Sequence, residues 1–440
     1  MRGAALLFPL STTMVPRRGA AHKHRPAIVR REVRELTALV PRVYLPAFLA
    51  TLGEAMLVVT LPLYLRELGM SFTLLSVVLA AAGVGALAFN VPAGVLIARW
   101  GDRDVMLWGV GVLAVSSWFL AVVTGSVVLV AVRFVAGIGM VSWLLSRQTF
   151  MFHEVRVGIR GRAMSVLGGL ARAAHLIGPA AGGFLATRLS FQASFVVAGA
   201  VAACGVLTLL GSRRNEVSHV PPDTRMLHDL TNVVRDHAGV LLKTGFAQLC
   251  TATIRHGRFV VLPLYGASLG LDAAQIGIVM SLSSGLDLVL FPVSGYLMDR
   301  FGRLYAIVPA FTMMGIALAL VPLAHGFGSL VLVGLGIGLG NGLSAGTMLT
   351  LSTDLAPQRG PSEFLGALGL LRDIGKVAAP VIAGTIADAF SLGTAAVVLG
   401  AVGVLGAISF VVLVGETHTR EVPVLQSSDG IPRMLNPPST

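Results

Sequence analysis

The chain has 440 residues, of which 55% are hydrophobic and only 12% are charged, and its mean hydropathy is +0.82. A soluble domain must cover its surface with polar groups, so this composition excludes a soluble globular protein and indicates a polytopic membrane protein. The net charge of +12 would favour a nucleic-acid partner in a soluble chain, but its distribution along this chain favours a membrane topology, and we expect no nucleic-acid partner.

Apolar stretches long enough to cross a hydrocarbon core about 30 Å thick recur twelve times along the chain. Short breaks of Gly, Pro and charged residues separate them. We expect each stretch to form a transmembrane helix, so the predicted fold class is an all-α membrane protein. The predicted spans are 43–65, 73–97, 104–124, 127–146, 163–186, 192–211, 243–265, 273–298, 304–323, 328–350, 364–388 and 394–414.

Basic residues are distributed unevenly between the two sides of these spans. Most of the 33 Lys and Arg residues fall in the two tails and in every second loop, whereas the opposite loops hold only Arg66 and Arg188. This asymmetry follows the positive-inside rule and predicts both termini in the cytoplasm. We therefore expect a multi-pass protein of the plasma membrane, with basic tails at 1–42 and 415–440. The stretch AALLFPL near the start is too short for an export signal.

The two halves of the chain repeat each other at a fixed offset. LPLY occurs at 61–64 and again at 262–265, an offset of 201 residues, and the same offset aligns Gly183 with Gly384. One register held over this length predicts two homologous six-helix bundles, 43–211 and 243–414, with a polar linker at 212–242. Parallel repeats of this kind are typical of secondary transporters, which bind substrate near the midplane between the halves.

A loop between the second and third spans of each half carries a charged glycine motif. GYLMDRFGR (295–303) resembles the loop motif of the major facilitator superfamily, and GVLIARWGDR (94–103) is its first-half counterpart, with Ala98 where the family has an acid. The resemblance implies a twelve-helix facilitator fold in which these charges join the halves and separate as the cytoplasmic face opens. The motif residues are Gly94, Arg99, Gly101, Gly295, Asp299, Arg300, Gly302 and Arg303.

Two further motifs lie in the first half. RFVAGIG (133–139) resembles the fourth-helix motif of the family, which implies proton transfer at Arg133; an arginine that reaches the outer interface is the alternative. GPAAGG (178–183) resembles the antiporter motif of drug-exporting members. Its glycines remove side-chain bulk and its proline kinks the helix, so close packing can seal the periplasmic side; ordinary small-residue packing is the alternative. The motif residues here are Gly178, Pro179, Gly182 and Gly183.

The repeat offset pairs a buried acid with a buried base. Glu54 lies in the middle of the first span, and its counterpart is Arg255. An arginine at the bilayer centre costs about 2.5 to 3.5 kcal/mol, so Arg255 and Arg258, which share a helical face, need partners or water. In the resembling family the first, fourth, seventh and tenth helices line the central cavity. We expect Glu54 to couple protons or bind substrate, or to be a structural partner of Arg255; a misassigned span position is a third reading.

Other ionisable residues lie inside the predicted spans of the second half. Asp287 is the only carboxylate deep in the eighth span, and a pair with Arg255 or Arg258 would neutralise both. Asn341 and Arg133 complete the expected cavity lining. His256 is interpreted as a packed polar residue. RDIGKVAAP places Arg372, Asp373 and Lys376 near the cytoplasmic end of the eleventh span, where we expect interfacial or gating contacts. Arg172 and His175 are further charged positions on the fifth span.

Patterns for catalysis, metals and cofactors do not fit their context. GLSAG (342–346) matches a nucleophile motif but lies in a Gly-rich membrane helix, without the strand-to-helix turn that would expose Ser344. His and Cys lack the spacing of metal ligands, and we find no phosphate-binding loop. Cys204 and Cys250 fall within spans, so no disulfide is expected. We therefore predict no enzymatic activity, no metal and no cofactor.

The predicted function is secondary active transport by alternating access. We expect a monomer that exports a small amphipathic or drug-like molecule in exchange for protons, with the lipid bilayer as its surroundings. A carrier for an anionic metabolite clamped by Arg255 and Arg258 is the first alternative. The second is a non-transporting membrane sensor or scaffold, whose basic linker and tails hold a partner or anionic lipid.

Overall fold

The structure, a computed structural model, describes residues 35–211, 234–358 and 360–417 of the chain. Most of the predicted tails and linker therefore lie outside the described residues. The first half contains the π-helical turn η1 (Val40–Tyr44) and helices α2 (Leu45–Glu67), α3 (Phe72–Trp100), α4 (Asp102–Val122), α5 (Ser126–Glu154), α6 (Val157–Arg188) and α7 (Phe191–Leu210). The second half contains α9 (Ala238–Ser268), α10 (Ala273–Phe301), α11 (Arg303–Ala319), η2 (Val321–Leu323), α12 (Phe327–Leu343), α13 (Thr347–Leu355), α14 (Pro361–Ala389), α15 (Leu392–Ser409) and η3 (Phe410–Val414).

Every predicted span coincides with helix, which confirms the all-α prediction, but the tenth span is not continuous. It breaks after Leu343, and α13 begins only at Thr347. Gly346 has a φ of 78°, which a glycine adopts without the steric cost of a Cβ. The Ser294 hydroxyl on α10 donates a 2.7 Å hydrogen bond to the Ala345 carbonyl. The span predicted at 328–350 is therefore present within Phe327–Leu355, but it is interrupted at 344–346, where a neighbouring side chain replaces a hydrogen bond that the helix loses.

Eight of the described helical segments have the length and apolarity of a membrane span. Three long helices are not among them: α6 with 32 residues, α9 with 31 and α14 with 29. Their charged side chains lower their hydropathy, whereas α11 is apolar but has only 17 residues. The low hydropathy of the three long helices marks where the polar interior of this multi-pass membrane protein lies.

The repeated LPLY sequence has the same structural role in both halves. The Tyr64 hydroxyl donates to the carbonyl of Val123 at 3.3 Å, and the Tyr265 hydroxyl lies 3.1 Å from the Pro322 carbonyl and 3.4 Å from the Ala324 carbonyl. Val123 and Ala324 both follow the third helix of their half, and they are 201 residues apart. The tyrosine thus joins the first helix to the third, which explains why both halves have it.

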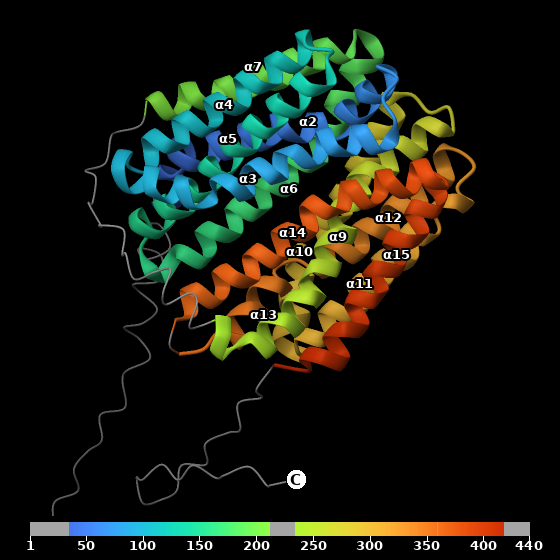
Figure 1. The fold of residues 1–440 in the computed structure, drawn as a ribbon. Coiled ribbons are helices and arrows are strands. Elements are labelled where there is room, and N and C mark those ends of the chain that lie inside the picture. The colour runs from blue at the N-terminus through green and yellow to red at the C-terminus, as the bar shows by residue number, and fades with distance from the viewer. Residues whose placement is uncertain (1–34, 212–233, 359, 418–440) are drawn as a thin grey trace, which may run out of the picture.

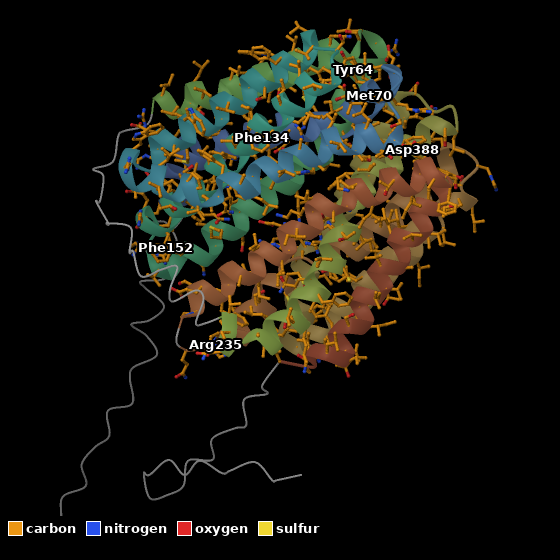
Figure 2. The ribbon with its side chains drawn as sticks, in the orientation of Figure 1. Tyr64, Met70, Phe134, Phe152, Arg235 and Asp388 are labelled. Atoms are coloured by element: carbon orange, nitrogen blue, oxygen red, sulfur yellow. The ribbon has the colours of Figure 1, made fainter. Side chains whose placement is uncertain are left out.

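The helices form two groups (Figure 1), here called the N bundle (α2–α7) and the C bundle (α9–α15). The most extensive contacts between them are α6 on α10 and α3 on α14. Tyr64, Met70 and Asp388 lie at one end of the molecule, and Phe152 and Arg235 lie towards the opposite end (Figure 2). We call the first the far end and the second the linker end.

The apolar core is shared at the far end and divided at the linker end. One cluster contains residues of both bundles, among them Leu75 of α3, Ile276 of α10 and Ala383 of α14. A second cluster, around Met106 and Met151, belongs to the N bundle alone. The third belongs to the C bundle alone and consists of Leu241, Phe364 and Leu368 with their neighbours. The cluster that both bundles share therefore joins them at the far end, whereas the two smaller clusters each stay within one bundle.

Candidate functional site

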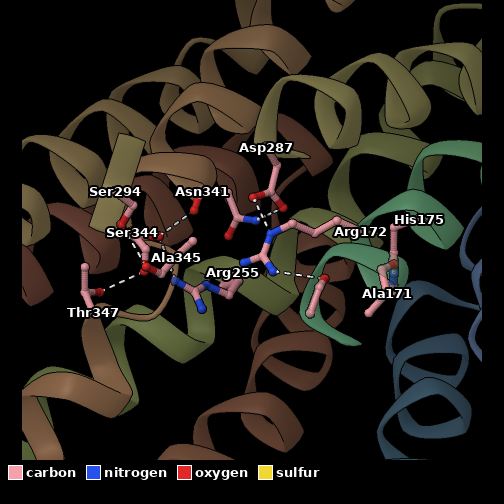
Figure 3. A network of polar contacts seen from close by, with 11 residues as sticks. Ala171, Arg172, His175, Arg255, Asp287, Ser294, Asn341, Ser344, Ala345 and Thr347 are labelled. Atoms are coloured by element: carbon pink, nitrogen blue, oxygen red, sulfur yellow. Dashed lines mark hydrogen bonds and ion pairs between the residues drawn. The ribbon is translucent and has the colours of Figure 1, made fainter. Parts of the chain in front are cut away.

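A hydrogen-bonded ion pair joins the two bundles midway along α6 and α10. Arg172 Nε lies 3.2 Å from Asp287 Oδ1, and Asn341 Nδ2 donates to the second carboxylate oxygen at 2.7 Å. Figure 3 shows Asp287 between these two partners. The Arg172 guanidinium also lies over the ring of Phe291, 4.1 Å from its centroid. Because Asp287 is only 7% exposed, a partner for each oxygen is what a buried carboxylate requires.

The partner of Asp287 differs from the prediction. The sequence favoured Arg255 or Arg258, but the carboxylate pairs with Arg172, because the face of α10 that carries it packs against α6 and α12. Arg172 was recognised as an intramembrane charge without being placed in the site. The sequence signal for this pair is a basic residue on the fifth span and an acidic residue on the eighth span. These two spans, α6 and α10, are neighbours across the interface between the bundles.

Arg255 occupies the C bundle beside the break in the tenth span. Its Nη2 donates to Ser344 Oγ at 2.7 Å, and that hydroxyl donates to the Asn341 carbonyl at 2.8 Å. Ser344 therefore links Arg255 to the residue that holds Asp287 (Figure 3). Ser344 of the GLSAG sequence thus positions the Arg255 guanidinium. Ser344 reaches Arg255 because it lies in the turn after α12.

Arg258 is the more buried of the two arginines on α9. It is 6% exposed, and its guanidinium lies over the Phe259 ring at 4.7 Å. Within the described residues, its Nε and Nη1 make no hydrogen bond. The cation is therefore stabilised by the aromatic ring and by the electrostatic attraction of Asp287.

A cavity of about 210 Å³ lies in the C bundle, chiefly between α9 and α14. We call it the C pocket; its lining residues are Gln248, Thr251, Ala252, Arg255, His256, Met348, Arg372 and Lys376. The adjacent Asp373 forms an ion pair with Lys376, whose Nζ lies 2.7 Å from Asp373 Oδ1. Arg372 Nε lies 3.7 Å from the same oxygen. Arg372 and Lys376, for which interfacial or gating contacts are predicted, lie on the pocket wall with Arg255 and His256.

Glu54 and Arg133 lie together inside the N bundle. They line one small cavity of about 10 Å³ with Ser116 and Ser117 of α4. The Glu54 carboxylate also attracts His175 of α6 electrostatically, and His175 Nδ1 lies 2.9 Å from the Ala171 carbonyl. The expected pair of Glu54 with Arg255 is not recorded in the described residues, because Glu54 faces α4 and α5 of its own bundle.

The GPAAGG sequence packs α6 closely against two helices. A Cβ at Gly178 or Gly182 would collide with the backbone of α2, at Ala55 or Met56, and a Cβ at Gly183 would collide with Ala273 of α10. These collisions would occur within one bundle and between the bundles, respectively. The three glycines are therefore required by close approach on two sides of α6.

Pro179 interrupts the hydrogen bonding of α6 at the same place. The next backbone amide, that of Ala180, donates to Ser281 Oγ on α10 at 3.0 Å. In addition, a Cβ at Gly277 of α10 would collide with the Pro179 carbonyl. The motif thus makes a hydrogen bond and a close backbone contact across the interface between the bundles.

The loop motif lies at the linker end and forms tight turns. Gly101 has a φ of 85° and Gly302 a φ of 113°, which only glycine adopts readily. The Glu416 carboxylate accepts from the Arg303 amide at 2.9 Å, and Arg303 Nε lies 2.7 Å from Asp354 Oδ2. This half of the motif therefore stabilises the C bundle internally.

The remaining motif residues are not packed against the other bundle. A Cβ at Gly94 or Gly295 would meet nothing within 4 Å, and Arg99 and Asp299 are exposed. Arg300 donates to the Tyr296 hydroxyl on its own helix at 2.6 Å. The charge contacts between halves that the motif predicts are not recorded among the described residues, in agreement with the divided core at this end.

No group of three or more His, Cys, Asp or Glu side chains that could hold a metal ion occurs in residues 35–211, 234–358 and 360–417. Cys204 and Cys250 are both free thiols.

Comparison with known families gives the same architecture from an independent source. Residues 43–375 and 244–437 match the model of the family described as Major Facilitator Superfamily. The chain belongs to the major facilitator superfamily. Its proteins are transporters, and the two overlapping matches together span both bundles.

Two transporters of this superfamily are similar in sequence over part of their length. An uncharacterized MFS-type transporter, Rv1250 of Mycobacterium tuberculosis, is 35% identical over 127 residues, which is 28% of this chain and 21% of that protein. The quinolone resistance protein NorA of Staphylococcus aureus is 24% identical over 154 residues, 35% of this chain and 39% of that protein. The matched stretches thus cover well under half of these relatives.

Solved structures of transporters share the facilitator fold over most of the chain. A D-xylose-proton symporter superposes with a TM-score of 0.71 at 16% identity, covering 87% of this chain and 98% of that one. A point mutant of the nucleoside transporter NupG gives a TM-score of 0.72 at 14% identity, covering 84% and 98%. At these identities the similarity establishes the fold alone.

Proposed function

We propose that this transporter exports a small amphipathic molecule in exchange for protons by alternating access. The observation that carries the proposal is the core that both bundles share at the far end and that divides at the linker end. Two bundles that share an apolar core at one end, with charged residues between them, form an arrangement that can rock about a central site. We place the linker end in the cytoplasm, following the distribution of Lys and Arg.

Glu54 is the proposed proton-coupling acid. It lies within the N bundle beside Arg133, in a cavity with room for about one water molecule. A carboxylate there can alternate between an ion pair with Arg133 and a protonated, neutral state, which is the chemistry that exchange of a proton requires. His175, which the Glu54 carboxylate attracts electrostatically, lies at the interface between the bundles, because its ring centroid is 6.3 Å from that of Phe259 on α9.

Two observations support export of drug-like molecules. The GPAAGG sequence packs α6 against α2 and α10, as a seal on the far side requires. In addition, one relative is named for quinolone resistance. Quinolones are amphipathic molecules of the size that the proposal requires, so norfloxacin is a suitable first probe, followed by a panel of further quinolones and lipophilic dyes.

The test measures norfloxacin flux into proteoliposomes with an acidic lumen. The native protein should accumulate norfloxacin against its gradient, whereas Glu54→Gln should reduce accumulation at least tenfold and retain exchange of labelled for unlabelled probe. Glu67→Gln is the matched control, because Glu67 lies exposed at the end of the same helix. It should transport normally.

Each part of the proposal has its own contrary result. Flux that ignores an imposed pH gradient would refute proton coupling. Normal uphill transport by Glu54→Gln would remove Glu54 from the mechanism. A well-folded protein that moves no compound in the panel would contradict the export of drug-like molecules.

A further inference from the structure

The C pocket contains more positive charge than its carboxylates can neutralise. Arg255, Arg372 and Lys376 line it together with His256, and Asp373 is the adjacent carboxylate. Asp373 is engaged by Lys376 at 2.7 Å, and Asp287, farther along the network, is engaged by Arg172 and Asn341. Within the described residues, Arg372 therefore has only a long ion pair, at 3.7 Å from Asp373, and Arg255 has no ion pair with a carboxylate.

The contacts of these two arginines are weak, and Arg255 is partly buried, whereas the Arg372 side chain is 41% exposed. Arg255 donates to a neutral hydroxyl, Ser344 Oγ, and Arg372 Nε lies 3.7 Å from Asp373. The Nε atoms of both arginines are buried and make no hydrogen bond in the described part of the chain. Cations withdrawn from water are stabilised when an anion pairs with them. The pocket is therefore electrostatically incomplete.

We propose that the C pocket binds the anionic group of an amphipathic organic substrate: a carboxylate, phosphonate or sulfonate. The inference rests on the proposed function and specifies the class of molecule carried. Arg255 and Arg372 pair with the anion, and the Gln248 and Thr251 side chains add polar contacts. A volume of about 210 Å³ corresponds to roughly seven waters at about 30 Å³ each, which suits an anionic head with a short apolar stem beside Met348.

Binding is tested with three probes of equal shape and different charge: 4-phenylbutyrate, 4-phenylbutanol and 4-phenylbutylamine. Affinities are measured by calorimetry on the purified full chain in nanodiscs of zwitterionic lipid. Phenylbutyrate should bind at least tenfold more tightly than the alcohol and the amine. Arg255→Gln and Arg372→Gln should each weaken its binding at least tenfold, and Arg372→Lys should recover part of the loss.

The control is Arg188→Gln, which removes an exposed arginine at the far end of α6 and should leave phenylbutyrate affinity unchanged. The melting temperature of each unliganded variant shows whether that variant is folded. If a variant does not fold, the inference is tested by the affinities of the native protein for the three probes. Equal binding of phenylbutyrate and phenylbutanol would overturn the inference.

An anionic lipid headgroup could occupy the same pocket. A second experiment distinguishes lipid binding from substrate binding. Nanodiscs with phosphatidylglycerol are compared with zwitterionic ones, and co-purified lipid is measured by mass spectrometry. If phosphatidylglycerol displaces phenylbutyrate and is lost from Arg372→Gln, the pocket holds lipid and the substrate inference is wrong. If anion binding fails but pH-driven export of another compound persists, the proposed function stands without this inference. If the anion binds but flux does not depend on pH, the inference about the C pocket stands and the proposed proton coupling is wrong.

A separate observation concerns the far end, where each bundle caps a helix of the other. Asp388 at the end of α14 accepts hydrogen bonds from the first two amides of α3, those of Phe72 at 3.0 Å and Thr73 at 2.7 Å. Thr187 Oγ1 at the end of α6 accepts from the Ala274 amide of α10 at 3.0 Å. Helix amides of the first turn have no partner within their own helix, so each contact satisfies one bundle with an atom of the other.

The two caps are related by the repeat. Thr187 and Asp388 are 201 residues apart, and so are Thr73 and Ala274. Each helix also has a cap of its own: Ser71 accepts from the third amide of α3, and Asp272 does the same for α10. The contacts from Thr187 and Asp388 are therefore additions that join the bundles, one neutral and one charged.

We infer that Thr187 and Asp388 form a paired latch that holds the far end closed. Opening of that end must break both contacts, because each joins helices of different bundles. The Asp388 contact is the stronger, since a carboxylate at a helix N-terminus gains from the helix dipole and from charge-assisted hydrogen bonds. The latch is thus asymmetric, although its geometry is symmetric.

Spin labels at Leu189→Cys and Phe390→Cys report the opening of the far end. These exposed positions lie just beyond the latch residues and are themselves repeat-related; Cys204 and Cys250 are first replaced by Ala. In Asp388→Ala, the population at longer distance should rise at least fivefold, and in Thr187→Val it should rise less. Thr187→Asp should reduce it.

Asp272→Ala is the matched control, because it removes an aspartate cap of α10 that stays within one bundle. It should leave the distance distribution unchanged. An Asp388→Ala distribution identical to that of the parent would overturn the latch, and so would an equal shift in Asp272→Ala, which would assign the effect to capping in general.

Discussion

The two interfaces between the bundles are related by the repeat but are held in different ways. Midway along α6 and α10 lie the Arg172–Asp287 ion pair and the hydrogen bond from Ala180 to Ser281. At the repeat-related positions of α3 and α14, Asp373 corresponds to Arg172, but Ala86 stands in place of Asp287 and Ala80 in place of Ser281. One interface is thus fixed by polar contacts at its middle, and the other lacks the same contacts there.

The difference explains where the C pocket lies. Without a base at position 86, Asp373 turns to Lys376 and Arg372 of its own helix, and these cations become part of the pocket wall. The duplicated architecture has therefore diverged, with one interface held by an ion pair between the bundles and the charges of the other lining the C pocket. The interiors diverge too, since Glu54 has Arg255 as its counterpart.

The largest expected effect comes from removing the acid of the fixed interface. Asp287→Ala leaves Arg172 without a carboxylate in a largely buried place, which should lower the free energy of unfolding by about 3 kcal/mol and abolish transport. Asp373→Ala, at the other interface, removes a more exposed ion pair and should cost less than about 1 kcal/mol. Thermal and denaturant unfolding in detergent measure both, and equal losses would contradict the comparison.

The fold was largely predictable from the sequence, because span length and the repeat offset are properties of the chain itself. The twelve spans and the two bundles were predicted in this way, and the superfamily was predicted from the resemblance of the loop motif GYLMDRFGR. The partner of Asp287 was not, because it depends on which face of α10 meets α6. The break at 344–346 was missed because a glycine-rich apolar run also suits a continuous helix, and the C pocket was missed because Arg372 and Lys376 matched an interfacial pattern equally well.

An intermediate effect is expected from filling the close contact between α6 and α10. Gly183→Val places a side chain against the backbone of Ala273, and such overpacking should cost about 2 kcal/mol and reduce transport at least tenfold. Gly168→Ala on the same helix is the control, since its Cβ would meet atoms only at 3.6 Å or more. Unimpaired stability and flux of Gly183→Val would show that the interface yields easily.

The smallest effect is expected from one hydroxyl at the fixed interface. Ser281→Ala removes the acceptor of the Ala180 amide and should lower the free energy of unfolding by about 1 kcal/mol. Ser283→Ala is the matched control, because the buried Ser283 hydroxyl makes no hydrogen bond within the described residues and its removal should cost nothing. Unfolding measurements that rank the two variants in the opposite order would contradict the assigned bond.

The turn that separates α12 from α13 sets an order of events during membrane insertion. Phe327–Leu355 is apolar enough to span the bilayer as one segment, and a continuous helix satisfies its own backbone amides in lipid. The hydrogen bond from Ser294 to the Ala345 carbonyl exists only after α10 has packed beside it. We therefore expect this segment to enter the bilayer straight and to bend when the C bundle assembles, so that Ser344 reaches Arg255 as a late step in the biogenesis of the transporter.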